Sequence, residues 1–304
     1  WDHELLEEFD VPEAMLPEVR PSSDEATYGS TDPDGFLGAE VPVAGALGDQ
    51  QAALFGQTCF DEGDAKNTYG TGSFYLMNTG EEAVESEHGL LTTIGFQLSG
   101  EPVRYALEGA IFSTGAAIEW LEDVGFVDDP AETAALARSV DSTDGVYVVP
   151  AFTGLGAPRW DGRARAAILG MTRGTRKEHV VRATLEAITY QTRDIAEAME
   201  ADSGVETTSI RVDGGAVKND FLCQLQADIL GTEVARPEVD GTTALGSAYA
   251  AGLAVGYWDD IDELRENWQV DREFSPEMDR ERADRMYGRW DDAVERSLDW
   301  AREE

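Results

Sequence analysis

Three apolar stretches of this chain each run into glycines and then into a helical pattern, and this repeated order limits the fold most. The stretches end at Gly48-Asp49, Gly70-Thr71-Gly72 and Asp213-Gly214-Gly215. Strands that alternate with helices favour a layered α/β fold, in which ligands bind in a crevice beyond the strand ends. We therefore expect an α/β protein with a ligand cleft near these glycines.

The apolar periodicity around these turns predicts the remaining elements. Strands are expected at 40–47, in a hairpin within 65–77, and at 91–97, 103–107, 145–150, 166–171, 209–212 and 233–236. Helices are expected at 1–19, where prolines break the pattern, and at 50–60, 115–124, 131–140, 179–199, 219–230, 243–254 and 281–302.

The charge is strongly one-sided. Asp and Glu number 61 against 23 Lys and Arg, which gives a net charge of −38, and the acidic residues are spread along the whole chain. Such a surface repels phosphate backbones and anionic lipids, so we expect no nucleic-acid or membrane partner. The pattern predicts a salt-adapted, halophilic protein. The alternative is an ordinary acidic protein tuned for solubility.

Few residues here can form disulfides, metal sites or hydrolase triads. Cys59 and Cys223 are the only cysteines, and their apolar neighbours predict buried free thiols in a reducing cytoplasm. The three histidines are scattered, so no hydrolase triad and no metal site is expected. The chain opens on Trp1 where a gene product has Met, so it is expected to be a fragment, a processed product or a sequence that does not begin at the start of its gene.

Asp49 is the first candidate for chemistry. It follows an expected strand and precedes an expected helix, which would point its carboxylate into the crevice above the sheet. Phosphoryl transfer to an alcohol needs a carboxylate in such a place to accept the hydroxyl proton. The alternative is a plain N-cap, a role that Asp fills at many helix starts.

The glycine-rich turns are candidates for binding phosphate or a flat ring. Gly70 and Gly72 around Thr71 would let backbone N–H groups approach phosphate oxygens, although a plain hairpin turn explains them equally. Gly214 and Gly215 leave room for a planar group against the backbone, and Asn219 could cap the next helix or reach that ligand. Neither a Walker A nor a Rossmann glycine motif is present.

Taken together and in order, these segments resemble the glycerol kinases of the FGGY carbohydrate kinase family. The resemblance to glycerol kinases is carried by Gly48 to Gln57, Lys66 to Gly72, Val146 to Pro158, Arg211 to Ala216 and Leu245 to Tyr249, and Ala166 to Glu186 resembles the second signature of the broader FGGY family. It implies an actin-like ATPase (ribonuclease H-like) fold, of which residues 1–57 would be the remainder of the first, glycerol-binding domain. Residues 58–304 would be the second, nucleotide-binding FGGY domain.

The resemblance also implies the activity and the site. ATP would phosphorylate glycerol to sn-glycerol 3-phosphate, with Asp49 as general base and with Gln50 and Phe74 as further glycerol contacts. The nucleotide contacts would be Thr71, Gly72, Gly115, Glu119, Gly214, Gly215 and Asn219. The family often has Gln at the position of Glu119, and a carboxylate is less favourable beside ADP.

Other expectations follow from what this stretch does not contain. Mg²⁺ would bind mostly through first-domain residues that are not found in this sequence, and the chain alone is expected to be inactive. Another FGGY sugar kinase and a nucleotide-binding module without activity remain as alternatives, and a homo-oligomer is left open.

Overall fold

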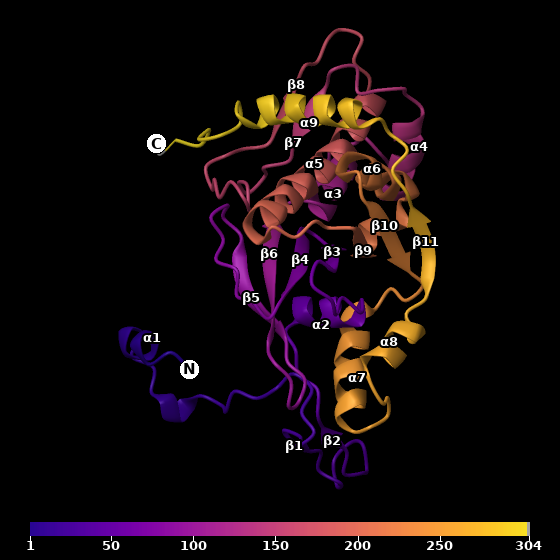
Figure 1. Ribbon diagram of the computed structural model, residues 1–304. Coiled ribbons are helices and arrows are strands. Elements are labelled where there is room, and N and C mark those ends of the chain that lie inside the picture. The colour runs from indigo at the N-terminus through magenta and orange to yellow at the C-terminus, as the bar shows by residue number, and fades with distance from the viewer. Residues whose placement is uncertain (303–304) are drawn as a thin grey trace.

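A seven-stranded mixed sheet forms the centre of the computed structural model, which describes residues 1–302 (Figure 1). The strand order is β11-β10-β9-β3-β4-β6-β5. Strands β3, β9 and β10 are parallel to one another, and the other neighbours pair antiparallel. The bounds are β3 Ala65–Tyr69, β4 Ser73–Gly80, β5 Leu91–Phe96, β6 Arg104–Ile111, β9 Ser209–Gly214, β10 Glu233–Pro237 and β11 Val270–Phe274.

Helices cover both faces of this sheet, because its strands carry apolar residues on both sides. Tyr75 of β4 packs in the same cluster as Ile195 of the long helix α5 (Lys177–Ser203). The next residue, Leu76, packs against Leu54 of helix α2 (Asp49–Gly56) on the opposite face. The predicted α/β layering is therefore confirmed.

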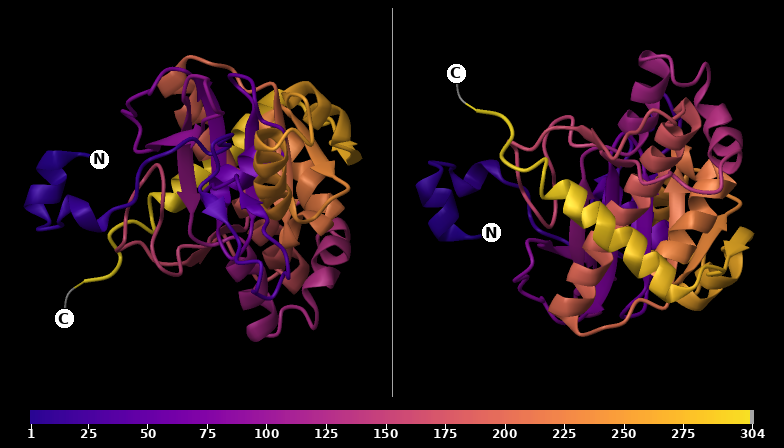
Figure 2. Two further views of the ribbon diagram at one scale, coloured as in Figure 1. Left: turned by 90° about the horizontal axis from the view of Figure 1, so that it is seen from below. Right: turned by 90° about the horizontal axis from the view of Figure 1, so that it is seen from above.

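The other helices join one of these two layers (Figures 1 and 2). Around α5 lie α3 (Gly115–Asp123), α4 (Thr133–Arg138), α6 (Asp220–Leu230) and α9 (Arg280–Val294). Beside α2 lie α7 (Thr242–Ala254) and α8 (Ile261–Asn267). Short 3₁₀ turns are η1 (Glu13–Met15), η2 (Pro130–Glu132) and η3 (Gly215–Lys218).

Helices α2 and α7 touch through glycine. A Cβ added to Gly56 would lie 2.0 Å from the carbonyl oxygen of Thr242, and one added to Gly246 would lie 1.8 Å from that of Ala52. No side chain larger than hydrogen fits at either position, so the two backbones are in direct contact. The glycines therefore let α2 pack directly against α7.

Several expected elements are shorter than predicted, or wrong. The strand expected at 40–47 is reduced to β2 (Pro42–Val43), which pairs only with β1 (Gly29–Ser30) and lies outside the main sheet. Both strands are exposed, so no buried side chains stabilise a longer pairing between β1 and β2. The helix expected at 1–19 is only α1 (His3–Glu8), and it lies apart from the body of the molecule (Figure 1).

Other expectations are confirmed with small shifts of their ends. The 65–77 hairpin is β3–β4, and the strands expected at 145–150 and 166–171 form a separate pair, β7 (Tyr147–Val149) and β8 (Ala167–Leu169). Both cysteines are buried free thiols. Among residues 1–302, no helix combines the length and the apolar character needed to span a bilayer.

Candidate functional site

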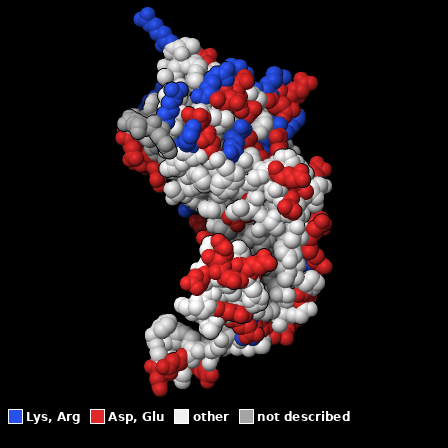
Figure 3. Space-filling view, turned by 90° about the vertical axis from the view of Figure 1, so that its left-hand side faces the viewer, with Lys and Arg blue, Asp and Glu red and all other residues white. Residues whose placement is uncertain are grey.

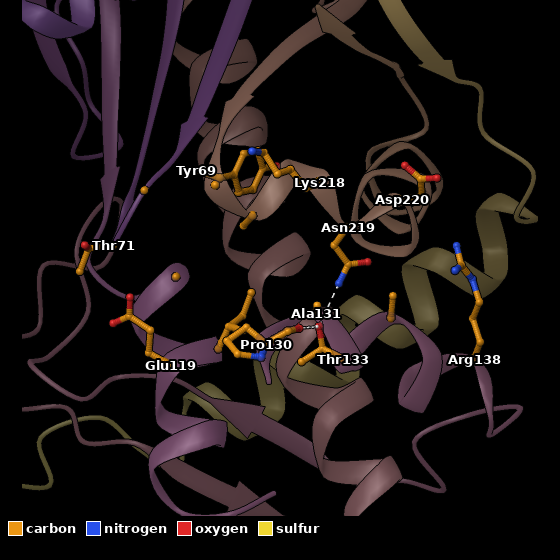
Figure 4. Close-up of a pocket in the computed structure, with 16 residues that line it drawn as sticks. Tyr69, Thr71, Glu119, Pro130, Ala131, Thr133, Arg138, Lys218, Asn219 and Asp220 are labelled. Atoms are coloured by element: carbon orange, nitrogen blue, oxygen red, sulfur yellow. Dashed lines mark hydrogen bonds between the residues drawn. The ribbon is translucent and has the colours of Figure 1, made fainter. Parts of the chain in front are cut away.

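A cavity of about 550 Å³ opens beside the carboxyl ends of β3 and β9 (Figure 4). These strands are parallel, and Tyr69 at the end of one pairs with Gly214 at the end of the other. The turns that follow them therefore meet at one edge of the sheet. The lining residues are Tyr69, Gly70, Thr71, Gly115, Ile118, Glu119, Pro130, Ala131, Thr133, Ala134, Arg138, Gly215, Ala216, Lys218, Asn219 and Asp220.

The hairpin turn after β3 is held tightly against the start of α3. The N–H of Gly115 donates to the carbonyl oxygen of Gly70 at 2.9 Å, and a Cβ on Gly115 would lie only 2.5 Å from that oxygen. A Cβ on Gly72 would lie 2.2 Å from the carbonyl oxygen of Ile111. Gly72 therefore does not line the cavity but lets the turn close, which leaves Thr71 exposed at the cavity wall.

The two glycines after β9 have different tasks. Gly214 has φ +96°, and a Cβ there would lie 2.3 Å from the carbonyl oxygen of Tyr69, so it is required by the fold. A Cβ on Gly215 would meet no atom within 4 Å. Gly215 instead presents bare backbone to the cavity, which is the surface that a flat ligand needs.

Asn219 caps α6 and also lines the cavity. Its Oδ1 accepts hydrogen bonds from the N–H groups of Phe221 at 3.0 Å and Leu222 at 3.1 Å, which caps α6. Its amide Nδ2 donates to Oγ1 of Thr133 at 3.1 Å across the cavity floor (Figure 4). The side chain is therefore fixed in orientation while it lines the cavity.

The charges at the cavity are mixed. The ammonium of Lys218 lies 3.3 Å from Asp240, and the Asp220 carboxylate accepts from Arg236 at 3.0 Å. The Arg138 guanidinium lies 5.6 Å from the centre of the Phe221 ring. Glu119 is exposed at the opposite wall, where Figure 4 shows its carboxylate near the Thr71 side.

The other three predicted residues lie away from this cavity, beside the opposite face of the sheet. Asp49 is exposed and is the first residue of α2, with Gly48 as N-cap. The expectation that Asp49 ends a sheet strand is wrong, and so is the N-cap alternative. Phe74 on β4 is 37% exposed. The side-chain oxygen Oε1 of Gln50 accepts a hydrogen bond from Nζ of Lys66. Lys66 was not among the residues predicted to form the site.

Residues 1–302 bring no three His, Cys, Asp or Glu residues together in a metal-binding arrangement. Because Mg²⁺ in kinase sites is usually held by one or two carboxylates together with substrate phosphates and waters, we derive no step through that ion.

A mixed sheet with helices on both faces and a ligand-sized cavity at parallel strand ends defines a ligand-binding α/β protein. The chain belongs to the FGGY family of carbohydrate kinases. The model of the FGGY family of carbohydrate kinases, C-terminal domain, matches residues 65–255, and the N-terminal domain model matches residues 1–56.

Similar proteins agree with this assignment. The chain is 79% identical to "Glycerol kinase" of Haloarcula marismortui and 76% identical to that of Haloferax volcanii, each over all of this chain. The solved structure "Crystal structure of Plasmodium falciparum glycerol kinase with ADP" is 39% identical and has a TM-score of 0.93 over 98% of this chain and 60% of its own. The chain spans 60% of the Haloarcula marismortui relative and 59% of the Haloferax volcanii relative.

Proposed function

We propose that the protein containing these residues transfers the γ-phosphoryl group of ATP to glycerol and yields sn-glycerol 3-phosphate. The observation that carries the proposal is the cavity at the ends of β3 and β9, open over Gly215, in a chain that shares a TM-score of 0.93 with an ADP-bound glycerol kinase. The 79% identity to haloarchaeal relatives of that name favours glycerol over other carbohydrates.

Asp49 is the proposed general base. Its carboxylate would take the proton of a glycerol hydroxyl while the hydroxyl oxygen bonds to the γ-phosphorus and the bond from that phosphorus to ADP breaks. The backbone N–H of Gln50 donates to Oδ1 of Asp49 at 2.8 Å, and the side-chain amide Nε2 of Gln50 donates weakly to Oδ2 at 3.5 Å, so Gln50 orients the carboxylate. Gln50 and Phe74 would supply a polar contact and an apolar wall for glycerol.

The nucleotide would occupy the cavity, with its base or sugar against Gly215 and with Thr71, Gly115 and Asn219 around it. Gly72 and Gly214 would serve by shaping the two turns. In this scheme residues 1–57 complete a first domain and residues 58–304 form the second. An ATP-consuming enzyme with two buried free thiols fits a reducing cytoplasm.

Measuring glycerol-dependent ADP release tests the proposal. The full-length gene product that carries residues 1–304 should turn over glycerol in preference to sugars such as xylulose. Residues 1–304 alone should bind ADP without glycerol-dependent turnover, because most phosphoryl-transfer catalysis comes from positioning both substrates. A preference of the full-length protein for a sugar would favour another FGGY kinase, and no turnover of any of them would favour a binding module.

The two glycines after β9 should respond differently to substitution. Gly215→Val should leave the protein folded and raise the Kd for ADP roughly tenfold or more, since each tenfold is about 1.4 kcal/mol of lost contact. Gly214→Ala should lower stability by about 2 kcal/mol or more, because of its positive φ and the close Tyr69 carbonyl. Calorimetric titration and thermal melts in molar KCl measure both. Equal effects of the two changes on ADP binding would contradict the assignment of Gly215 to the ligand and Gly214 to the fold.

Glu119 should weaken nucleotide binding slightly. Glu119→Gln removes a negative charge from the cavity wall, so ADP should bind about two- to fivefold more tightly, the size of an exposed charge interaction. The gain should appear at the lowest salt at which the protein is folded and vanish in molar KCl, where screening is strong. Unchanged affinity at low salt would place the Glu119 carboxylate away from the phosphates.

A further inference from the structure

Lys66 is a buried ammonium with no role in the function proposed so far. It is one of only three lysines in the sequence, and its exposed fraction is 0%. A buried charge is costly unless its hydrogen bonds are made, so its position needs an explanation beyond solubility.

The strand pattern places Lys66 on the α2 side of the sheet. Lys66 pairs directly with Leu76, which packs in one cluster with Leu54 of α2. Thr68 and Phe74, two positions further along each strand, share this side because side chains alternate. The residues proposed to contact glycerol therefore lie on the same side as the ammonium.

The three protons of the ammonium are matched by three acceptors. Nζ of Lys66 donates to Oε1 of Gln50, to Oγ1 of Thr68 at 3.0 Å and to the carbonyl oxygen of Phe74 at 3.2 Å. Two of these acceptors belong to the proposed glycerol contacts, one from α2 and one from β4. A compact ammonium with three donors suits acceptors that converge from different elements, whereas a planar guanidinium does not.

Carboxylates surround this group from three elements. Burial lowers the pKa of Lys66 to about 8, and the charges of Asp213 on β9, Glu108 on β6 and Asp49 on α2 oppose this fall. Burial also raises the pKa of Glu108, and the Lys66 charge opposes that rise. The nearby Cys59 thiol stays neutral because burial raises its pKa to about 12.

We propose that Lys66 is a positioning residue for the glycerol site, whose buried ammonium fixes the Gln50 side chain and the Phe74 backbone in one arrangement beside Asp49. Without the ammonium, the Gln50 amide keeps only its weak contact with Asp49 Oδ2 at 3.5 Å, and the two walls of the glycerol site are no longer joined. Nucleotide binding is untouched, because Lys66 does not line the cavity at β3 and β9. The inference rests on the proposed function.

The first test is Lys66→Met in the full-length gene product, with Lys177→Met as the matched control on the exposed start of α5. Lys66→Met should lower kcat/KM for glycerol about tenfold to a hundredfold, as for the loss of a hydrogen bond to a charged group, and leave the Kd for ADP unchanged. The control should match the parent enzyme. Equal losses in glycerol and ADP affinity would show a merely structural lysine and overturn the proposal.

A double-mutant cycle separates positioning from packing. If Lys66 acts through Gln50, then Lys66→Met should cost much less in a Gln50→Ala background than in the parent. Additive losses would overturn the assignment. If the parent enzyme itself does not phosphorylate glycerol, the proposed function fails, whereas normal turnover with additive losses removes only the inference about Lys66.

The pH profile of the parent enzyme gives a test that does not depend on the folding of a variant. As the pH rises through about 8, Lys66 loses its proton, so KM for glycerol should rise while KM for ATP stays constant. Lys66→Arg stays charged throughout but does not match the three converging acceptors, so its KM for glycerol should be raised at every pH and should no longer change with pH. A glycerol KM that is constant between about pH 7 and pH 9.5 would overturn the proposal.

Discussion

Replacing Asp49 by Asn in the full-length gene product should reduce kcat roughly 10²–10⁴-fold, which is the range for loss of a general base. The substitution keeps the shape of the side chain, and an amide oxygen can still accept the Gln50 N–H that now reaches Oδ1 at 2.8 Å. What is lost is the ability to hold the hydroxyl proton of glycerol. The effect should therefore appear in kcat, with little change in the binding of ADP.

The control is Asp123→Asn, a change of the same chemistry at the exposed end of α3. Its kcat should equal that of the parent enzyme. Steady-state rates of ADP release at saturating glycerol and ATP provide the measurement. A fall of less than about threefold for Asp49→Asn would remove Asp49 from the role of base, since general-base loss costs far more than this.

The sequence was sufficient to predict those helices and strands whose apolar pattern reflects which face is buried. The helix expected at 219–230 is α6 at Asp220–Leu230, and its start follows from the Asn219 cap. The strand β11 and the helix α8 were missed because neither shows a strong apolar pattern. Four of the five residues of β11 are exposed, and α8 buries only Leu264. The tail helix ends at Val294 instead of 302.

The separate motifs that line the cavity could be predicted from the sequence, but their meeting in one cavity could not. Asn219 lies far in sequence from Thr71, and nothing local states that β3 and β9 are parallel neighbours with Tyr69 opposite Gly214. That register is what brings the two glycine turns together. Lys66 was missed for a related reason. A lysine between Ala65 and Asn67 resembles any solvated strand residue until α2 covers it.

The largest effect on stability is expected from salt. Figure 3 shows acidic side chains over much of one face, with basic ones gathered mainly at one end. Arg236 illustrates how the few basic residues are used, since it contacts both Asp220 and Asp271. With 61 acidic residues against 23 basic ones, most carboxylates cannot be paired in this way, and their repulsion opposes the compact state.

Screening should remove most of this repulsion. The Debye length falls from about 10 Å at 0.1 M to about 3 Å at 1 M salt, so only adjacent charges still interact. We expect the Tm to rise by roughly 10 °C or more between these KCl concentrations, at about 2–4 °C per kcal/mol for a domain of this size class. Thermal melts followed by circular dichroism measure it, and sucrose serves as an uncharged control for solute exclusion.

A variant with fewer unpaired carboxylates tests whether repulsion is the cause. The chosen residues are exposed and form no ion pair among residues 1–302: Glu122→Gln, Asp123→Asn, Glu233→Gln and Glu238→Gln. Each change removes one negative charge and leaves the size of the side chain unchanged, so the variant should melt higher than the parent at low KCl and gain less from added salt. If repulsion is not the cause, the Tm of the variant and that of the parent will rise by the same amount as KCl is added. A parent Tm that does not change with KCl would show that the acidic surface does not limit folding.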